Sequence, residues 1–343
     1  MQIKSVIRIL GLLLMLFSLA IIPPILVSII YQDGETWSFF YALILIFVSG
    51  LLLWLPAMQA KTDLKLRDGF IIVVLFWFVL STFASLPMLL SDSLNISITN
   101  AMFESVSGLT TTGATIITNI DTLPESILFY RQYLQWLGGL GIIVLAVAVL
   151  PMLGVGGMQL YKAEVAGPIK NKITPRITET AKWLWVVYLI MTFLCGLSYY
   201  FAGMNLFDSI CHSFSTIAIG GFSTHNESFG YYDSHLIELV AIIFMIAACL
   251  NFSLHYLAFK SKSILPYKKD NEAYFFVFLT LLISFLAILY IYSLSSEMNI
   301  EEIIKNTFYA VSISTTTGFT NSNYYQYIGF LPILLILFSF IGG

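Results

Sequence analysis

The sequence has little charge, and this shortage excludes whole classes of protein. Only 10% of the 343 residues are Asp, Glu, Lys or Arg, whereas 58% are hydrophobic and 15% are aromatic. Soluble domains carry about 25% charged residues, so a water-soluble fold of this length would lack the polar surface to cover itself. The net charge of -3 excludes the strongly basic face that nucleic-acid-binding proteins need. A polytopic membrane protein remains.

Cysteines and catalytic patterns are also scarce. Cys195, Cys211 and Cys249 lie in or beside apolar stretches without the spacing of a metal or redox site, so we expect free thiols and no disulfide framework. The sequence has no Ser-His-Asp order, no HExxH pattern and no paired intramembrane aspartates. It therefore indicates neither an enzyme nor a bound cofactor.

Long apolar runs dominate the chain. A helix needs about 20 apolar residues to cross the hydrocarbon core of a bilayer, and eight runs approach or exceed this length. The first starts with Lys4 and Arg8 but is too long for a signal peptide and has no small-residue cleavage site, so we expect a retained helix, kinked by Pro23 and Pro24. The eight runs are Val6 to Ile30, Trp37 to Ala57, Phe70 to Leu90, Ile127 to Leu150, Trp183 to Phe201, His235 to Leu257, Ala273 to Tyr292 and Tyr327 to Ile341.

Basic residues predict the orientation of these spans. Fourteen of the 16 Lys and Arg residues fall on one side of successive spans, in the N-terminal segment and in the loops Gln59 to Gly69, Pro151 to Lys182 and Lys260 to Glu272. The positive-inside rule places that side in the cytoplasm, together with the N-terminus. Only Arg131 and Lys305 lie on the opposite side.

The predicted outer side holds 13 of the 19 acidic residues. Two interpretations stay open: a solvated outer face without further role, or a mouth that concentrates cations electrostatically. These residues are Asp33, Glu35, Asp92, Glu104, Asp121, Glu125, Asp208, Glu227, Asp233, Glu238, Glu297, Glu301 and Glu302.

Three outward segments repeat one pattern at intervals of 108 and 97 residues. They run from Ala101 to Thr115, from Ser209 to Ser223 and from Asn306 to Thr320, and they align on Gly113, Gly221 and Gly318. The hydroxyl residues Ser107, Ser215 and Ser312 share one column, and Thr115, Ser223 and Thr320 share another. Each copy lies between two spans, which predicts a unit of helix, short re-entrant helix, glycine-containing turn and helix.

This pattern suits the binding of a dehydrated alkali cation. Non-helical backbone lies at membrane depth only where it is buried in protein or lines a watery cavity, so the three turns should converge on one axis. Glycine adopts backbone angles closed to other residues, which lets consecutive carbonyls point the same way. Rings of such oxygens replace the hydration shell of a cation. Each short helix would also aim its partly negative C-terminal end at that axis.

With these motifs the sequence resembles the Trk/Ktr/HKT superfamily of potassium transporters, and specifically its bacterial TrkH-type membrane subunits. The resemblance covers the whole chain, including the two additional N-terminal spans. Besides the three turns, it rests on residues 138–141 (GGLG), 156–164 (GGMQLYKAE), 174–182 (TPRITETAK) and 219–225 (IGGFSTH).

The resemblance implies an all-α polytopic membrane protein of repeated M1-pore helix-M2 units. Two extra N-terminal transmembrane helices and an inner loop would occupy residues 1–69, the first repeat 70–160, an inner linker with the second repeat 161–260, and an incomplete third repeat 261–343. It also implies a bacterial inner membrane, a homodimer and a cytoplasmic nucleotide-binding regulatory subunit of TrkA type. The family has four repeats in one subunit and only three filter turns are present, so we expect a C-terminal truncation.

The resemblance assigns the selectivity filter and its ion. Potassium would be held by Thr111, Thr112, Ile219, Gly220, Thr316 and Thr317. The remaining filter residues would be Gly113, Ala114, Ala218, Gly221, Phe222, Gly318 and Phe319. Gly113 stands where a serine accompanies sodium permeation in related plant transporters, so a preference for potassium follows.

Other motifs carry weaker predictions. The glycines at 138–141 and 154–157 do not follow a strand and have no Lys-Ser/Thr, so they indicate close helix packing instead of a phosphate loop. A metal site formed by His225, Glu227, Asp233 and His235 is conceivable, although the ligand spacing is loose. Arg131 is expected to pair with an acid or to anchor at the interface.

Three functions remain open from the sequence. The first is a filtered potassium permease of a Trk-type system. The second is a secondary transporter coupled to protons or sodium, which would usually show ionisable residues buried in mid-span. The third is a scaffold subunit that does not conduct.

Overall fold

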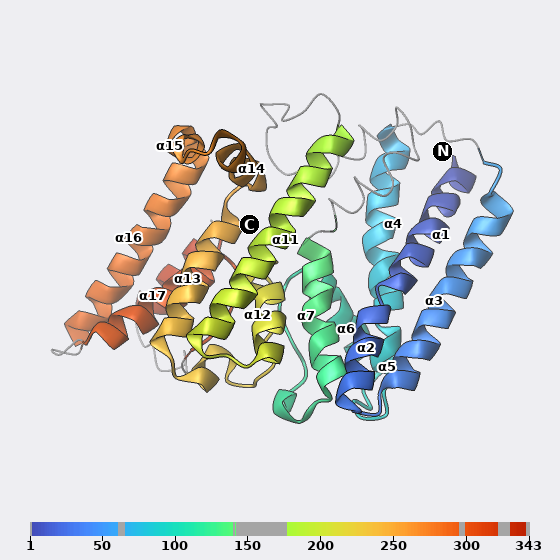
Figure 1. Ribbon diagram of the computed structural model, residues 1–343, viewed down its shortest axis with the longest axis horizontal. Helices are drawn as coiled ribbons and strands as arrows, with labels where there is room; N and C mark the ends of the chain where they lie inside the picture. The colour runs from blue at the N-terminus through green and yellow to red at the C-terminus, as the bar shows by residue number, and fades with distance from the viewer. Residues whose placement is uncertain are drawn as a thin grey trace. The chain divides into compact units, whose positions relative to one another are not determined.

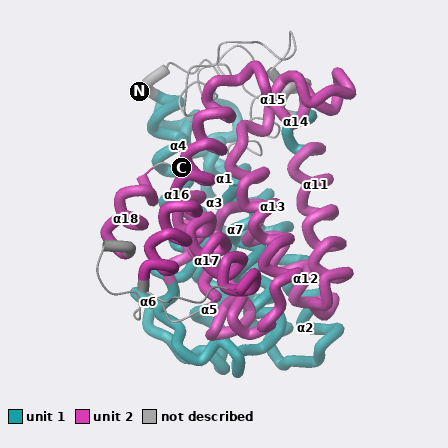
Figure 2. Tube along the Cα trace, turned by 90° about the vertical axis from the view of Figure 1, so that its left-hand side faces the viewer, with its two compact units in different colours: residues 1–110, 115–185 teal, residues 111–114, 186–343 magenta. Residues whose placement is uncertain are grey.

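The computed structural model describes residues 2–60, 66–139, 141, 177–294, 299–321 and 330–340, and these residues form helices joined by turns (Figure 1). The expected all-α fold is confirmed. The chain divides into two compact units, one of residues 1–110 and 115–185, the other of residues 111–114 and 186–343 (Figure 2). The short segment 111–114 therefore groups with the later half of the chain.

The first unit contains the first seven α-helices. They are α1 (Ile3–Leu19), α2 (Ile22–Tyr31), α3 (Thr36–Ala57), α4 (Leu66–Ala84), α5 (Leu86–Leu90), α6 (Ile98–Leu109) and α7 (Glu125–Gly139), with the 3-10 turn η1 (Ile120–Thr122) before α7. The helix α11 (Ile177–Ala202) leads into the second unit. That unit contains α12 (Leu206–Ile217), η4 (Ser228–Tyr232), α13 (His235–Cys249), α14 (Phe252–Ser261), α15 (Leu265–Lys269), α16 (Asn271–Leu294), α17 (Ile300–Ser314) and α18 (Phe330–Phe338).

Among the described residues, five helical segments are long and apolar enough to cross a membrane. They are Ile3–Tyr31, Thr36–Ala57, Asp68–Leu90, Lys182–Ala202 and Asn271–Ser293, and they coincide with five of the eight expected runs. The runs from Ile127 and from Tyr327 extend outside the described residues. The chain is therefore a multi-pass membrane protein, as expected.

The expected span from His235 to Leu257 is not one straight helix. Helices α13 and α14 are bent by 96° at a break between them, so they count as a single broken span at most. Leu250 is extended with ψ 145°, and the side chain of Asn251 accepts a hydrogen bond from the N–H of Ser253 and so caps a new helix. The high average hydropathy of the run masks this single polar capping residue.

The first helical hairpin packs through glycine. Helix α1 lies on α3, and a Cβ atom built on Gly11 would stand 2.7 Å from the carbonyl oxygen of Gly50. A Cβ on Gly50 would stand 2.8 Å from the carbonyl oxygen of Gly11. Small residues thus bring the two backbones together, as is common between membrane helices. The expected kink is also present, because helix ends at Leu19 and resumes with prolines in the first turn of α2.

In the second unit, α17 is the central element. It packs against α13, α16 and α18. A buried apolar cluster joins Ile283 and Ala287 of α16 to Tyr309 and Ala310 of α17 and to Leu334 of α18. Three neighbours therefore fix the axis of α17, and with it the start of the turn that follows.

Many large apolar side chains are exposed on the outer helices. Examples are Val74 (67%), Phe78 (66%) and Phe193 (69%). Apolar surface on this scale is typical of a chain whose helices meet lipid. The short helices α6, α12 and α17 are by contrast largely buried inside the protein.

Candidate functional site

Three short helices end at the same distance from the three repeated glycines. Helices α6, α12 and α17 end at Leu109, Ile217 and Ser314, each four residues before its glycine. The next residue in each copy donates its N–H to the carbonyl four positions back, with N···O distances of 2.8, 3.0 and 2.9 Å. The three copies thus leave the helix in the same way.

The backbone of the three turns repeats an unusual pair of angles. The three repeated glycines all have left-handed φ values, 75° at Gly113, 78° at Gly221 and 83° at Gly318. Two residues earlier, a branched residue is also left-handed in every copy. These residues are Thr111 (φ 55°), Ile219 (φ 55°) and Thr316 (φ 60°).

Left-handed backbone is rare for branched residues, and strained residues of this kind cluster at functional sites. When left-handed residues alternate with ordinary ones, successive carbonyl groups turn toward the same side of the chain. The expected alignment of carbonyl oxygens therefore has a backbone basis in all three turns. Only the glycine of each pair was visible in the sequence.

Within the second unit, the turns abut one another in series. A Cβ atom on Gly113 would lie 2.0 Å from the carbonyl oxygen of Gly220, and one on Gly221 would lie 2.0 Å from that of Thr317. Each glycine of the first two turns thus lies against the backbone just before the glycine of the next turn. A side chain at either position would force the neighbouring backbone to shift, so glycine is favoured by space as well as by φ.

The other predicted filter residues differ in exposure. Thr112, Ala114 and Thr316 are exposed, whereas Gly220 and Thr317 are buried. Phe222 and Phe319 are almost fully buried, and the ring of Phe319 lies 4.5 Å from that of Phe229. These two phenylalanines can therefore offer an ion only their carbonyl groups. The hydroxyl of Ser312 already donates to the carbonyl oxygen of Phe319, at 2.7 Å.

A buried ion pair in the first unit is hydrogen-bonded to the residues that follow the first turn. Glu104 of α6 accepts hydrogen bonds from the hydroxyl of Thr115 (2.5 Å) and from the N–H of Ile116 (2.7 Å). Its other oxygen pairs with Nε of Arg131 of α7 at 3.2 Å, and both side chains are fully buried. Arg131 Nη2 also donates to the hydroxyl of Thr115, at 2.9 Å. The expected pairing of Arg131 with an acid is confirmed.

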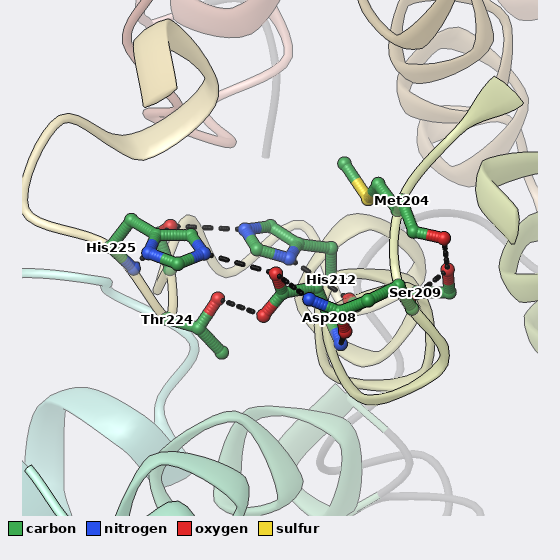
Figure 3. Close-up of polar contacts among 8 residues, drawn as sticks. Met204, Asp208, Ser209, His212, Thr224 and His225 are labelled. Carbon is green, nitrogen blue, oxygen red and sulfur yellow. Dashed lines mark hydrogen bonds and ion pairs between the residues drawn. The ribbon is translucent and has the colours of Figure 1, made fainter. Parts of the chain in front are cut away.

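A histidine takes the corresponding place after the second turn (Figure 3). His212 of α12 is fully buried, with Nε2 3.0 Å from the hydroxyl of Ser223 and Nδ1 3.0 Å from the main-chain oxygen of Asp208. The carboxylate of Asp208 accepts from the hydroxyl of Thr224 (2.6 Å) and lies 3.0 Å from Nε2 of His225. Three consecutive residues after Phe222 are therefore held by side chains of α12.

The pKa of Asp208 is lowered from its usual value. Burial of the carboxyl group acts to raise the pKa, but hydrogen bonds from His225 and Thr224 outweigh it. Asp208 lies in the first turn of α12, outside the spanning helices. It is therefore an ionised acceptor over the ordinary pH range.

The strand after the third turn is held by different elements. The main-chain oxygen of Thr320 accepts from the N–H of Phe229 in η4, at 2.9 Å. The side chain of Asn321 donates to Glu238 of α13 (2.6 Å) and to the main-chain oxygen of Lys305 (3.1 Å). The residues after the third turn are thus held by η4, α13 and α17.

The expected outer acidic face is partly wrong. Glu35, Glu104, Asp208 and Glu238 are at most 4% exposed, because each accepts hydrogen bonds from neighbouring polar groups. Asp233 is exposed and lies 3.5 Å from Lys305. The loops between spans thus contain structural carboxylates as well as solvated ones.

The residues of the conceivable metal site are not brought together. His225 faces Asp208, and His235 lies within 3.2 Å of Glu238 and 3.6 Å of Glu301. Among the residues that the structure describes, no group of three or more His, Cys, Asp or Glu side chains is arranged to hold a metal ion.

Two smaller expectations are met where they can be assessed. A Cβ atom on Gly138 of α7 would lie 1.9 Å from the main-chain oxygen of Leu109, which indicates the close packing expected of this glycine. Residues 154–157 lie outside the described part. The three cysteines are free thiols.

Sequence reasoning does not single out Glu104 and His212, the two side chains that contact the hydroxyl residues after the first and second turns. A signal was available: both stand nine residues before their glycine, so one alignment column holds Glu104, His212 and Tyr309. Because these residues differ in type, the column was not recognised as functional. The pattern that identifies them is a polar residue of any type nine residues before the glycine, together with a hydroxyl residue two positions after it.

Comparison with known proteins gives consistent matches. The family model TrkH, described as a cation transport protein, matches residues 36–343. The Trk system potassium uptake protein TrkH of Vibrio parahaemolyticus is 52% identical over 349 residues, covering 100% of this chain and 72% of that protein. The protein of the same name from Escherichia coli K12 is 48% identical, covering 100% of this chain and 71% of that protein.

A solved structure agrees with the sequence relatives. The crystal structure of the potassium transporter TrkH from Vibrio parahaemolyticus superposes with a TM-score of 0.88 at 48% sequence identity. The match covers 100% of this chain and 71% of that one. Fold and sequence therefore identify the same group of proteins.

Proposed function

Since the chain belongs to the TrkH family of cation transport proteins, we propose that it is the pore-forming subunit of a Trk-type potassium uptake system. The observation that carries this proposal is the repeated backbone of the three turns. Each turn has the same left-handed pair, and two of the three glycines lie against the next turn. Such a series is what a shared axis of carbonyl oxygens requires.

The chemistry follows from the turns and the helices before them. Potassium is held by the carbonyl groups of Thr111, Thr112, Ile219, Gly220, Thr316 and Thr317, which replace its water. The C-terminal ends of α6, α12 and α17 lie four residues before the glycines and add partial negative charge. No charged side chain is needed in the filter itself, so a cation is not trapped there by a full opposite charge.

The arrangement in the membrane is part of the proposal. Residues 1–69 form the N-terminal hairpin, and residues 70–160, 161–260 and 261–343 form three successive repeats. The basic loops and the N-terminus face the cytoplasm of a bacterial inner membrane, which follows from the distribution of Lys and Arg. A homodimer and a TrkA-type nucleotide-binding partner are proposed from the family alone.

Potassium-dependent growth tests the function. The gene, expressed in full in a host that lacks potassium uptake, should restore growth at low potassium and should take up rubidium in preference to sodium. Gly113→Ser should reduce that preference, because its side chain would meet the carbonyl oxygen of Gly220. An unchanged preference in a folded Gly113→Ser protein would contradict the assignment of the filter.

Cysteine labelling tests the orientation. Asp233 and Lys268 are both exposed, and the proposal places them on opposite sides of the membrane. Single cysteines at these positions, in a background without Cys195, Cys211 and Cys249, should react differently with an impermeant thiol reagent added to intact cells. Labelling at position 268 but not at 233 would reverse the orientation.

A further inference from the structure

We propose that Glu104 and His212 are positioning residues of the filter, which hold the strands leaving the first and second turns and so determine how well the filter selects its ion. The inference rests on the proposed function. It assigns a role to two buried side chains that touch no filter carbonyl themselves.

The two side chains occupy the same place in their repeats. Glu104 stands nine residues before Gly113, and His212 stands nine residues before Gly221. Each faces the hydroxyl residue two positions after that glycine: Glu104 accepts from Thr115 at 2.5 Å, and His212 lies 3.0 Å from Ser223. Two chemically different residues thus make the same connection.

The hydroxyls themselves are used in the same way. Thr115 accepts the N–H of Ile117 at 3.2 Å, and Ser223 accepts the N–H of His225 at 3.1 Å, so both close a turn with the residue two positions on. Each hydroxyl therefore links a short helix to the backbone of the exit strand. Removing either hydroxyl breaks both links at once.

Burial lowers the pKa of His212, so the fully buried ring is neutral, and its hydrogen bonds then fix the tautomer. The main-chain oxygen of Asp208 is an acceptor only, so Nδ1 must carry the proton and donate to it. In the neutral ring Nε2 is then an acceptor, and the hydroxyl of Ser223 donates to it. The imidazole thus plays the acceptor role that a carboxylate plays in the first repeat.

The two hydroxyl residues lie close to the filter along the chain. Thr115 and Ser223 each lie only two residues from the filter glycine, and the intervening residue contributes a carbonyl to the turn. A selective ring of carbonyls must keep its size when the smaller sodium ion enters. A helix fixed in its unit, joined to the residues after the turn by a hydrogen bond to its buried Glu104 or His212 side chain, resists that movement.

The test removes the hydroxyls one at a time. We compare the variants Thr115→Val and Ser223→Ala, each made in the full gene, with the control variant Ser213→Ala. Ser213 is buried in α12 and donates to the carbonyl oxygen of Ile210 in its own helix, at 2.7 Å. Rubidium and sodium uptake are measured in cells and normalised to folded protein by size-exclusion chromatography.

We expect the rubidium-to-sodium uptake ratio to fall at least about fivefold in Thr115→Val and Ser223→Ala, because each removes both the hydrogen bond to the short helix and the one that closes the turn. Ser213→Ala should stay within about twofold of the wild type. His212→Gln, whose amide oxygen can accept from Ser223, should retain more of the ratio than His212→Leu. The double variant His212→Leu/Ser223→Ala should be no worse than the worse single one, since both remove one interaction.

Two results would overturn the inference. One is a ratio unchanged within twofold in both hydroxyl variants while the wild type is selective. The other is an equal fall in Ser213→Ala, which would mean a general loss of packing. A wild-type protein that takes up rubidium but does not prefer it to sodium would instead remove the filter assignment, and with it the role of both side chains.

Discussion

The first and second turns are held at one register by opposite means. After the first turn, a fully buried carboxylate and guanidinium share the hydroxyl of Thr115. After the second, a neutral imidazole holds Ser223, and the ionised group, Asp208, acts one and two residues further on. The comparison teaches that geometry is repeated in this chain while the chemistry that produces it is not.

The difference should have energetic consequences. A buried ion pair depends on both partners, because removing one leaves an unpaired charge in a medium of low polarity. Removing one partner of a neutral hydrogen bond costs only the desolvation penalty of the neutral group that is left without a partner. The first turn should therefore be the more vulnerable to single substitutions.

The largest effect is expected for Arg131→Met. Glu104 is then left as an unpaired buried charge, and the protein should lose about 3–5 kcal/mol of stability. The double variant Glu104→Met/Arg131→Met should recover part of this loss, since it leaves no charge behind. Thermal unfolding in detergent measures both. A double variant no more stable than Arg131→Met would mean that the unpaired charge of Glu104 is not the cause of the loss.

A smaller loss is expected for His212→Leu. The hydroxyl of Ser223 and the main-chain oxygen of Asp208 would lose a partner in a buried place, which costs about 1–3 kcal/mol. The same unfolding assay applies. If His212→Leu were as damaging as Arg131→Met, the distinction between a neutral and a charged connection would be wrong.

The contribution of Asp208 should depend on pH. Because its pKa in the folded protein is below the usual 3.8, its stabilisation is complete at pH values above 3.8 and is lost as the pH falls through the folded-state pKa. Asp208→Asn should cost about 1–3 kcal/mol at pH 7, and the difference from the wild type should shrink below about pH 4. Unfolding temperatures of the two proteins at pH 7 and pH 3 give the comparison. A constant difference would assign the effect to packing.

The smallest effect is expected for Lys305→Ala. Its ammonium group is 40% exposed and lies 3.5 Å from the exposed carboxylate of Asp233, so the pair contributes at most about 1 kcal/mol. Added salt should reduce this contribution further. The variant therefore serves as a control for the buried pair, and a loss comparable to that of Arg131→Met would contradict the importance given to burial.

Much of the fold follows from hydropathy and register. The apolar runs predict the long helices, and the three glycines predict where the short helices end. Hydropathy could not reveal the 96° bend, because a single Asn251 cap in an apolar run leaves the average almost unchanged. Nor could the glycine pattern reveal that Ile219 is left-handed, since nothing in a branched side chain favours that conformation.

The site was predictable only in part, for a related reason. Small residues mark the turns because backbone conformation and space restrict them to glycine, serine and threonine. Glu104 and His212 occupy positions that require only a hydrogen-bond acceptor at a fixed distance. Several residue types meet that requirement. Likewise, counting acidic residues on one side of the spans places Glu35 and Glu238 on a solvated face, although both are buried and accept hydrogen bonds from Ser91 and Asn321.

The bend between α13 and α14 has a consequence for biogenesis. Residues 235–261 together are apolar enough to be recognised by the insertion machinery as one hydrophobic segment. His255 adds hydrogen bonds to the bent form, with Nε2 2.9 Å from the main-chain oxygen of Ala247 before the break and Nδ1 2.7 Å from the hydroxyl of Tyr267 after it. Tyr267 is synthesised after the segment itself, so part of what stabilises the bend is added only after residues 235–261 have been made.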